Sequence, residues 1–125
     1  MKNTKVWFII AGLAGFTGVA IGAFGAHGLK NIVSPESMEI YKTGVMYHLI
    51  HAVAILAIAI SGNTNFFKSA LFFMIGIILF SFSLYLYAIT QATGFAIITP
   101  FGGVSFLVGW FFLIIEGLKF NNRVK

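Results

Sequence analysis

The chain has 125 residues, enough for one domain. Hydrophobic residues make up 59% of it and charged residues only 9%, against the about 25% charged residues of a typical soluble domain. Such a chain cannot cover a water-facing surface, so lipid must be its solvent. The eight Lys and Arg residues stand at the ends of apolar runs, a pattern that excludes a nucleic-acid groove. The absence of cysteine excludes disulfides, thiolate metal ligands and Cys nucleophiles.

Four uncharged apolar runs are each close to the about 20 residues that a helix needs to cross a bilayer. An isolated strand in lipid would leave its backbone groups unpaired, so each run is predicted to be helical. The expected spans are residues 6–26, 43–62, 69–90 and 98–115. The predicted fold class is an all-α integral membrane protein, in which residues 1–125 form a single antiparallel bundle of four transmembrane helices.

The second helix is expected to begin before its apolar run. Ser34-Pro35-Glu36 combines a capping hydroxyl, a proline suited to the first helical position and an acid near the positive helix end. About two turns before residue 43 should therefore form an amphipathic extension outside the membrane or along its surface.

The connection between the third and fourth spans is expected to be a loop from Gln91 to Thr99. Gly94 and Pro100 act as breakers there.

The distribution of basic residues predicts the orientation. With four spans, both termini share a side with the 63–68 connection. That side carries six Lys and Arg residues and the other side two, which places both termini in the cytoplasm. The six are Lys2, Lys5, Lys68, Lys119, Arg123 and Lys125, and the two are Lys30 and Lys42.

Glycines recur along the first helix. Gly15, Gly18, Gly22 and Gly25 fall within about 80° of arc at 100° per residue, and Gly18 and Gly22 form a small-xxx-small pair. This face is expected to let another helix backbone approach closely. The alternative is a permeation path lined by glycine.

The second helix places Tyr41, Gly44, His48 and His51 on one face, expected one to two turns below the extracellular surface. His27 ends the first helix at the same surface. Three imidazoles there could bind a metal, ligate haem or relay protons. Alternatively, His48 and His51 hydrogen-bond to neighbouring helices, and His27 interacts with the helix dipole.

Polar side chains also concentrate where the third helix ends and the fourth begins. A shallow outward-facing pocket there would use the Thr99–Gly103 turn, and its ligand-binding candidates are Thr99, Gly102 and Gly103. The alternative is an interfacial belt of aromatic residues and hydroxyls. Hydroxyls of the third helix or this turn are the expected partners of the histidines.

No enzyme signature is present: the chain has neither H-E-x-x-H, nor a nucleophile elbow, nor a Gly-rich loop followed by Lys. Several ordered motifs nevertheless resemble the domain of unknown function 423 family, which includes the transmembrane protein 256 group. They are GAFGAHGL (22–29), Tyr41, Tyr47-His48, His51, SLY (83–85), TPFGG (99–103) and Gly109-Trp110.

The resemblance implies a four-helix fold in the plasma membrane and implies no activity. If the shared residues mark a site, they point to His27, Tyr41, His48, His51 and the Thr99–Gly103 turn.

Three hypotheses follow. The first is a non-enzymatic protein without a cofactor, which acts through helix packing in lipid with a second copy or a larger membrane protein. The second is a protein that binds a metal, haem or small ligand through an outer-leaflet His/Tyr cluster, with His48, His51 and His27 as candidate metal ligands. The third is a small oligomeric transporter or channel, against which the apolar inner half of the spans argues.

Overall fold

The computed structural model describes residues 2–124, and the surroundings of the side chains of residues 3–120. Within this part, four long apolar helical segments are able to cross a membrane, which confirms the predicted fold class. Three of them are α1 (Lys2–Gly28), α2 (Pro35–Ser61) and α5 (Thr93–Val124). The third span is a continuous stack of η1 (Thr64–Phe66), α3 (Phe67–Gly76), the π-helical η2 (Ile77–Ser81) and α4 (Phe82–Thr90).

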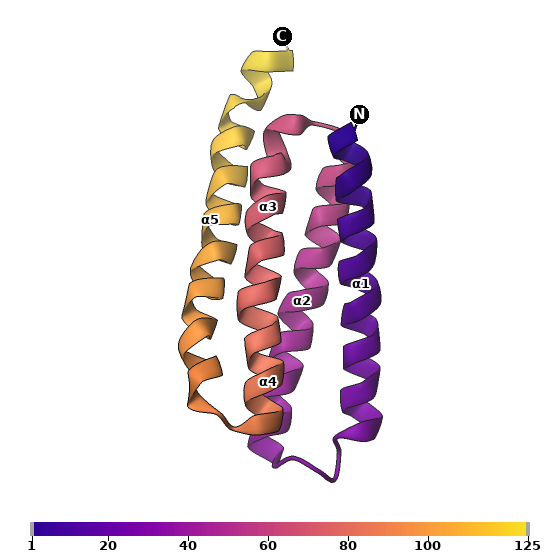
Figure 1. The fold of residues 1–125 in the computed structure, drawn as a ribbon. Coiled ribbons are helices and arrows are strands. Elements are labelled where there is room, and N and C mark those ends of the chain that lie inside the picture. The colour runs from indigo at the N-terminus through magenta and orange to yellow at the C-terminus, as the bar shows by residue number, and fades with distance from the viewer. Residues whose placement is uncertain (1, 125) are drawn as a thin grey trace.

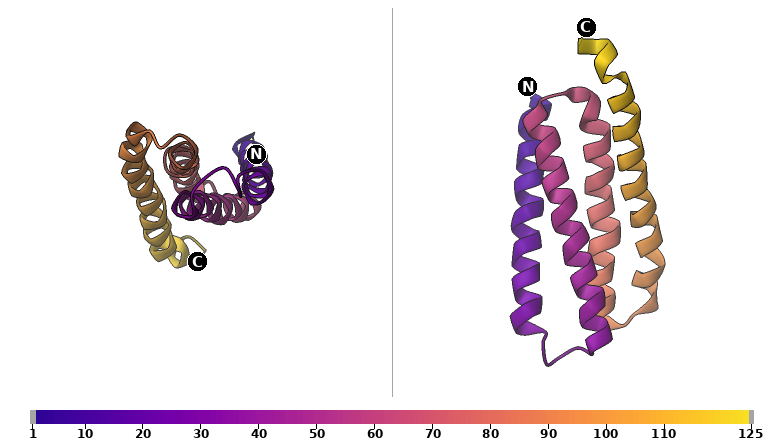
Figure 2. Two further views of the ribbon diagram at one scale, coloured as in Figure 1. Left: turned by 90° about the horizontal axis from the view of Figure 1, so that it is seen from below. Right: turned by 180° about the vertical axis from the view of Figure 1, so that it is seen from behind.

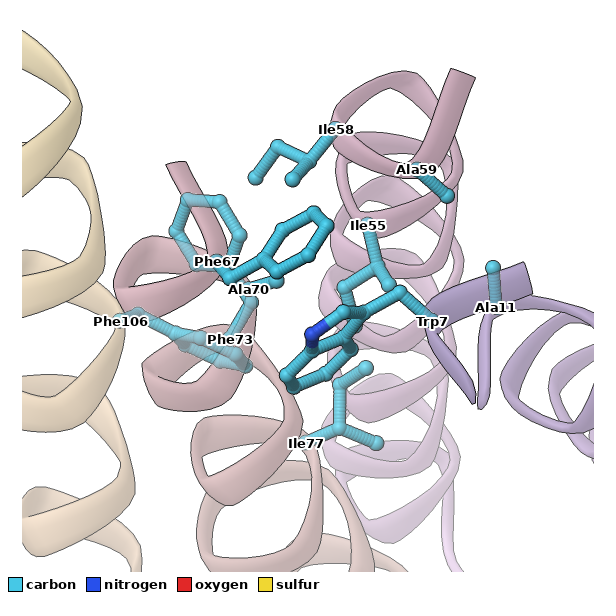
Figure 3. Close-up of a cluster of buried hydrophobic side chains, with 10 residues drawn as sticks. All are labelled: Trp7, Ala11, Ile55, Ile58, Ala59, Phe67, Ala70, Phe73, Ile77 and Phe106. Carbon is cyan, nitrogen blue, oxygen red and sulfur yellow. The ribbon is translucent and has the colours of Figure 1, made fainter. Parts of the chain in front are cut away.

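The spans alternate in direction, and α1 and α5 occupy the two outer positions (Figures 1 and 2). α1 packs mainly on α2, whereas α5 packs mainly on the third span. The main apolar core lies between α2 and the third span, where Ile55 and Phe73 are fully buried. Trp7 from α1 and Phe106 from α5 enter the same cluster (Figure 3). The two inner spans therefore carry the core and the outer helices cover it.

The start of α2 confirms the sequence prediction, and its first turns pack against the bundle. Pro35 is the first helical residue, and the Ser34 hydroxyl accepts a hydrogen bond from the Ser37 amide at 3.1 Å. Ser37 and Tyr41 are buried, and Gln91 Nε2 donates to Ser37 Oγ at 2.6 Å. The amphipathic extension thus packs one face, with Ser37 and Tyr41, against the end of the third span.

The expected loop from Gln91 to Thr99 is wrong. Gln91 ends the third span in the left-handed conformation, with φ of 58°, and α5 already begins at Thr93. Pro100 lies inside α5. Proline is tolerated within membrane helices where neighbouring helices re-satisfy the freed backbone groups. The Thr99–Gly103 segment is therefore helical instead of a turn.

Glycines mark the places where the backbones approach most closely. A Cβ on Gly102 would lie 2.2 Å from the backbone nitrogen of Phe80, so α5 touches η2 directly at this residue. Gly44 of α2 lies against the Tyr85 ring and the carbonyl of Ser81. The π-helical segment thus sits between two glycine contacts, one on each side of the third span.

The predicted glycine face of α1 divides into two parts. Cβ atoms on Gly18, Gly22 and Gly25 would come within 3.1 Å of α2 side chains, so these glycines stand at the α1–α2 seam. A Cβ on Gly15 would meet nothing within 4 Å. Gly15 therefore faces away from this close contact.

The adjacent pair Gly102 and Gly103 tests the approach of α5 to η2. Gly102→Ala should destabilise the protein by about 1–3 kcal/mol, because its methyl group would overlap the Phe80 backbone, which cannot rotate away. Gly103→Ala is the matched control, since its nearest neighbour would be the Phe80 side chain at 3.8 Å. Thermal unfolding in detergent measures both, and equal melting temperatures for the two variants would contradict the close approach.

Candidate functional site

His48 joins three helices in the middle of the bundle. It is fully buried, with Nδ1 2.8 Å from the Tyr85 hydroxyl on α4 and Nε2 3.2 Å from Thr17 Oγ1 on α1. Thr17 Oγ1 donates its single hydrogen to the Leu13 carbonyl at 2.8 Å, so it can only accept from His48. Nε2 therefore carries the hydrogen, and Nδ1 accepts from Tyr85. These are the donor and acceptor roles of the neutral imidazole, since a hydroxyl such as that of Tyr85 can either donate or accept.

His51 points toward α5. Trp110 Nε1 donates to His51 Nε2 at 3.0 Å, and His51 Nδ1 lies 2.7 Å from the Tyr47 carbonyl. An indole N–H only donates and a carbonyl only accepts, so the hydrogen of His51 is on Nδ1 and the lone pair of Nε2 is occupied. The ring also stacks on Phe106, with centroids 3.7 Å apart and planes inclined by 13°.

These arrangements do not fit a metal or haem site. The two histidines contact different helices, and all four of their ring nitrogens have partners within the bundle. His27 is exposed at the end of α1 and takes no part in either contact. Among the described residues, no group of three or more potential metal ligands comes together. Coordination would require these hydrogen bonds to break.

Tyr41, also predicted from the sequence, ties α2 to α1. Its hydroxyl donates to the Ile21 carbonyl at 2.5 Å, and its ring lies 5.1 Å from the ring of Tyr85. A Cβ on Gly25 would overlap the Tyr41 ring. Tyr41 is therefore held by α1 and α4 together, and its hydroxyl is already committed to the backbone.

The candidates on α5 make no hydrogen bond to the histidines. Thr99 Oγ1 is 2.6 Å from the Ser83 hydroxyl, which joins α5 to α4. Gly102 packs directly against η2 and has no space for a ligand, whereas Gly103 lines an open groove. The sequence expectation that the third helix supplies hydroxyl partners to the histidines holds for Tyr85 and His48.

His48 lies at the midpoint of α2. His48 is 13 residues from each end of α2, or about 20 Å by the helical rise of 1.5 Å per residue. Gly18, near the middle of α1, packs beside His48. The outer-leaflet placement stays a prediction, since the exposed Lys42 lies only six residues before His48 on the same helix.

Two grooves flank this midpoint. A groove of about 210 Å³ between α1 and the third span is lined by Thr17 and His48, among others. A larger groove, of about 420 Å³, lies between α2 and α5 beside His51. We call it the α2–α5 groove; its lining residues are Tyr47, His51, Phe80, Pro100, Gly103, Val104, Phe106, Leu107 and Trp110.

The contact of Trp110 with His51 escaped sequence reasoning. The two residues are 59 positions apart, and the motif Gly109-Trp110 does not by itself indicate a partner on another helix. The pairing of a donor-only indole with a buried imidazole could have suggested it, but no spacing rule connects different helices.

The structural role of the His51–Trp110 bond predicts a non-additive pair of substitutions. His51→Phe retains the stacking on Phe106 but leaves the Trp110 N–H without its acceptor, so it should destabilise by about 1–3 kcal/mol. Adding Trp110→Phe removes the orphaned donor and should recover part of that loss. Thermal unfolding of the two single variants and the double variant measures this, and strictly additive losses would mean that the bond does not stabilise the bundle.

Comparison with known proteins places these residues in a family. The model of the family described as "Protein of unknown function (DUF423)" matches residues 21–103. The UPF0382 membrane protein YwdK of Bacillus subtilis is 36% identical over 121 residues, which cover 93% of this chain and 98% of YwdK. A UPF0382 membrane protein of Staphylococcus epidermidis is 43% identical over 121 residues, with coverage of 93% and 98%.

The UPF0382 inner membrane protein YgdD of Escherichia coli is 36% identical over 125 residues, covering 97% of this chain and 95% of YgdD. No solved structure matches the chain. The four apolar helical spans agree with the membrane assignment that these relatives carry in their names. This chain is therefore a membrane protein and belongs to the DUF423 family, whose curated relatives are the UPF0382 membrane proteins.

Proposed function

We propose that this chain is a non-enzymatic protein of the cytoplasmic membrane that acts by packing a free face of α1 against a helix of a second copy. The main support for this proposal is the open space beside two glycines of α1. Cβ atoms on Gly12 and Gly15 would meet nothing within 4 Å, although both glycines lie in an apolar groove of about 390 Å³ between α1 and α2. Small residues on a lipid-facing helix let another backbone approach closely.

The position of α1 supports the proposal. It is an outer helix, and only 11% of its most apolar window is buried, against 39% for α2. Large apolar side chains such as Phe16 and Val19 project from it. An apolar helix of a second copy would cover this surface and fill the groove. The alternative partner for the same surface is a larger membrane protein.

Gly15→Leu and Gly18→Leu separate assembly from folding. Gly15→Leu should leave the melting temperature of the single bundle unchanged, because its side chain has room, but should reduce the dimer fraction in native mass spectrometry. Gly18→Leu should instead lower stability by about 1–3 kcal/mol, because its Cβ would lie 2.6 Å from Leu49 Cδ2.

A purely monomeric wild-type protein at the same concentrations would contradict self-association. If the protein is isolated from membranes in a larger complex, and Gly15→Leu dissociates that complex, the partner is a different membrane protein.

The bonding of the buried polar groups argues against a metal or haem site at the histidines and against a transport path. Among the described residues, Ser69 Oγ is the one buried side-chain oxygen or nitrogen without a hydrogen-bond partner. A metal or haem site would need free ligand atoms, and a transport path would need polar groups aligned across the bilayer. The four ring nitrogens of His48 and His51 already have partners within the bundle.

We also infer that both termini face the cytoplasm. Lys5, Lys68 and Lys119 lie at the end of the bundle that carries the termini, and Lys30 and Lys42 at the other end. Lys125 lies outside the described residues, and the side chains of Lys2 and Arg123 are not described, so their contribution rests on the sequence. The name of the related inner membrane protein YgdD supports the choice of membrane.

The orientation predicts opposite labelling of two connections. The chain has no cysteine, so single cysteines at Asn31 and Asn63 report without background. In bacteria with an intact cytoplasmic membrane, a membrane-impermeant maleimide should label Asn31→Cys and leave Asn63→Cys unlabelled. If the host has an outer membrane, that membrane is first made permeable to the reagent. Cell lysis should expose both, and the reverse pattern on intact cells would overturn the orientation.

A further inference from the structure

Tyr47 places a hydroxyl group near the midpoint of α2 without a partner among the described residues. It is 12 residues from the first residue of α2 and 14 from the last, and 38% of its surface is exposed. Among the described residues, none accepts or donates a hydrogen bond at its hydroxyl. The exposed side lines the α2–α5 groove.

The other tyrosines differ from Tyr47 in this respect. The hydroxyls of Tyr41 and Tyr85 are hydrogen-bonded inside the bundle. Tyr87 lies three residues from the end of α4, where water and lipid headgroups are within reach. Only Tyr47 combines mid-helix position, exposure to the lipid side and an unused hydroxyl.

An unpaired hydroxyl in hydrocarbon is unfavourable, and acyl chains carry no acceptor. A molecule that carries an acceptor oxygen into the α2–α5 groove would supply this hydroxyl with a partner.

The opposite wall of the groove offers an acceptor. Pro100 lines the groove and has no backbone N–H, so the Ala96 carbonyl lacks the donor that an α-helix would normally supply. Residues four apart share a helix face, and helical carbonyls point toward the C-terminus. The Ala96 carbonyl is thus directed along the face that Pro100 presents to the groove.

The floor of the groove is suited to a flat ring. The Tyr47 ring is inclined by only 10° to the ring of His51 and by 17° to that of Phe106, and Phe80 lies 4.8 Å from it. Aromatic rings favour offset stacking on one another. The volume of about 420 Å³ falls within the about 300–1,000 Å³ of small-molecule sites.

We propose that the α2–α5 groove binds a lipid-soluble ring ketone of the quinone class, with the Tyr47 hydroxyl donating to a ring carbonyl oxygen. The ring stacks on the aromatic floor and its aliphatic tail leaves the groove among the acyl chains. In the reduced form, a ring hydroxyl donates to the Ala96 carbonyl. A phospholipid tail would leave both polar groups unpaired, so the polar pair favours a ring that carries oxygen.

Decylubiquinone tests the proposal in the full chain reconstituted in nanodiscs. Trp110 lines the groove, and Trp7 is the only other tryptophan, so a Trp7→Phe background isolates its fluorescence. Quinones quench tryptophan, and binding should give a saturable curve above the linear quenching that partition into lipid produces. Quinone extracted from the washed nanodiscs of the unsubstituted chain, measured by absorbance, gives a second readout that is independent of the Trp7 substitution.

Two substitutions in the groove have matched controls. Tyr47→Phe should weaken binding by about threefold to tenfold, as the loss of one hydrogen bond does, whereas Tyr87→Phe should not. Gly103→Leu should abolish saturable binding, because its Cβ has space in the fold and its side chain would enter the groove. Gly117→Leu is its control on the same helix, with nothing within 4 Å and no contact with the groove.

Three outcomes would overturn the proposal. Linear quenching that is the same in wild type, Tyr47→Phe and Gly103→Leu would mean that the quinone only partitions into lipid. Saturable quenching by phosphatidylcholine with brominated chains that decylubiquinone does not displace would assign the groove to an acyl chain. Native mass spectrometry could also show a dimer that dissociates in Gly103→Leu but not in Gly15→Leu. That result would assign the α2–α5 groove to a second copy of the chain.

Discussion

The hydrogen bonds of His48 to Thr17 and Tyr85 are the interactions on which the arrangement of the spans depends. Lipid supplies neither water nor a hydrophobic force between helices, so packing and polar contacts must hold the bundle. His48 meets both needs, since one imidazole connects α2 to α1 and to α4. Removing it would leave the buried Tyr85 hydroxyl without this partner.

These bonds require short distances between helices, and glycine provides them. Gly18 lets α1 lie beside His48, and Gly44 lets α2 lie against Tyr85 and the backbone of Ser81. The π-helical segment η2 contributes by changing the local register of the third span. It presents Ser81 to α2, where its hydroxyl donates to the Gly44 carbonyl at 2.8 Å, and Phe80 to α5. Such π-helical segments are often found at functional sites.

The two faces of α2 have different roles as a result. His48 faces α1 and α4, and its surroundings are closed by hydrogen bonds and aromatic contacts. Tyr47, the preceding residue, faces the α2–α5 groove with its hydroxyl unused. α5 leaves this groove open because it packs mainly on the third span and reaches α2 through side chains such as Trp110. Neighbouring residues on one helix thus separate a closed polar core from an open groove.

By itself the sequence determined the fold class, because 59% hydrophobic residues and four uncharged runs leave only a bundle of membrane helices. It also located the start of α2 at Pro35 and the polar face with Tyr41, His48 and His51, since these depend on local capping and helical periodicity. The helical path through Pro100, the π-helical segment and the bond between Trp110 and His51 were decided only by the tertiary structure. The physical reason is that each of these features depends on which residues of a neighbouring helix lie at the same height along the bundle. The hydrophobic periodicity of a helix does not determine its axial register relative to its neighbours.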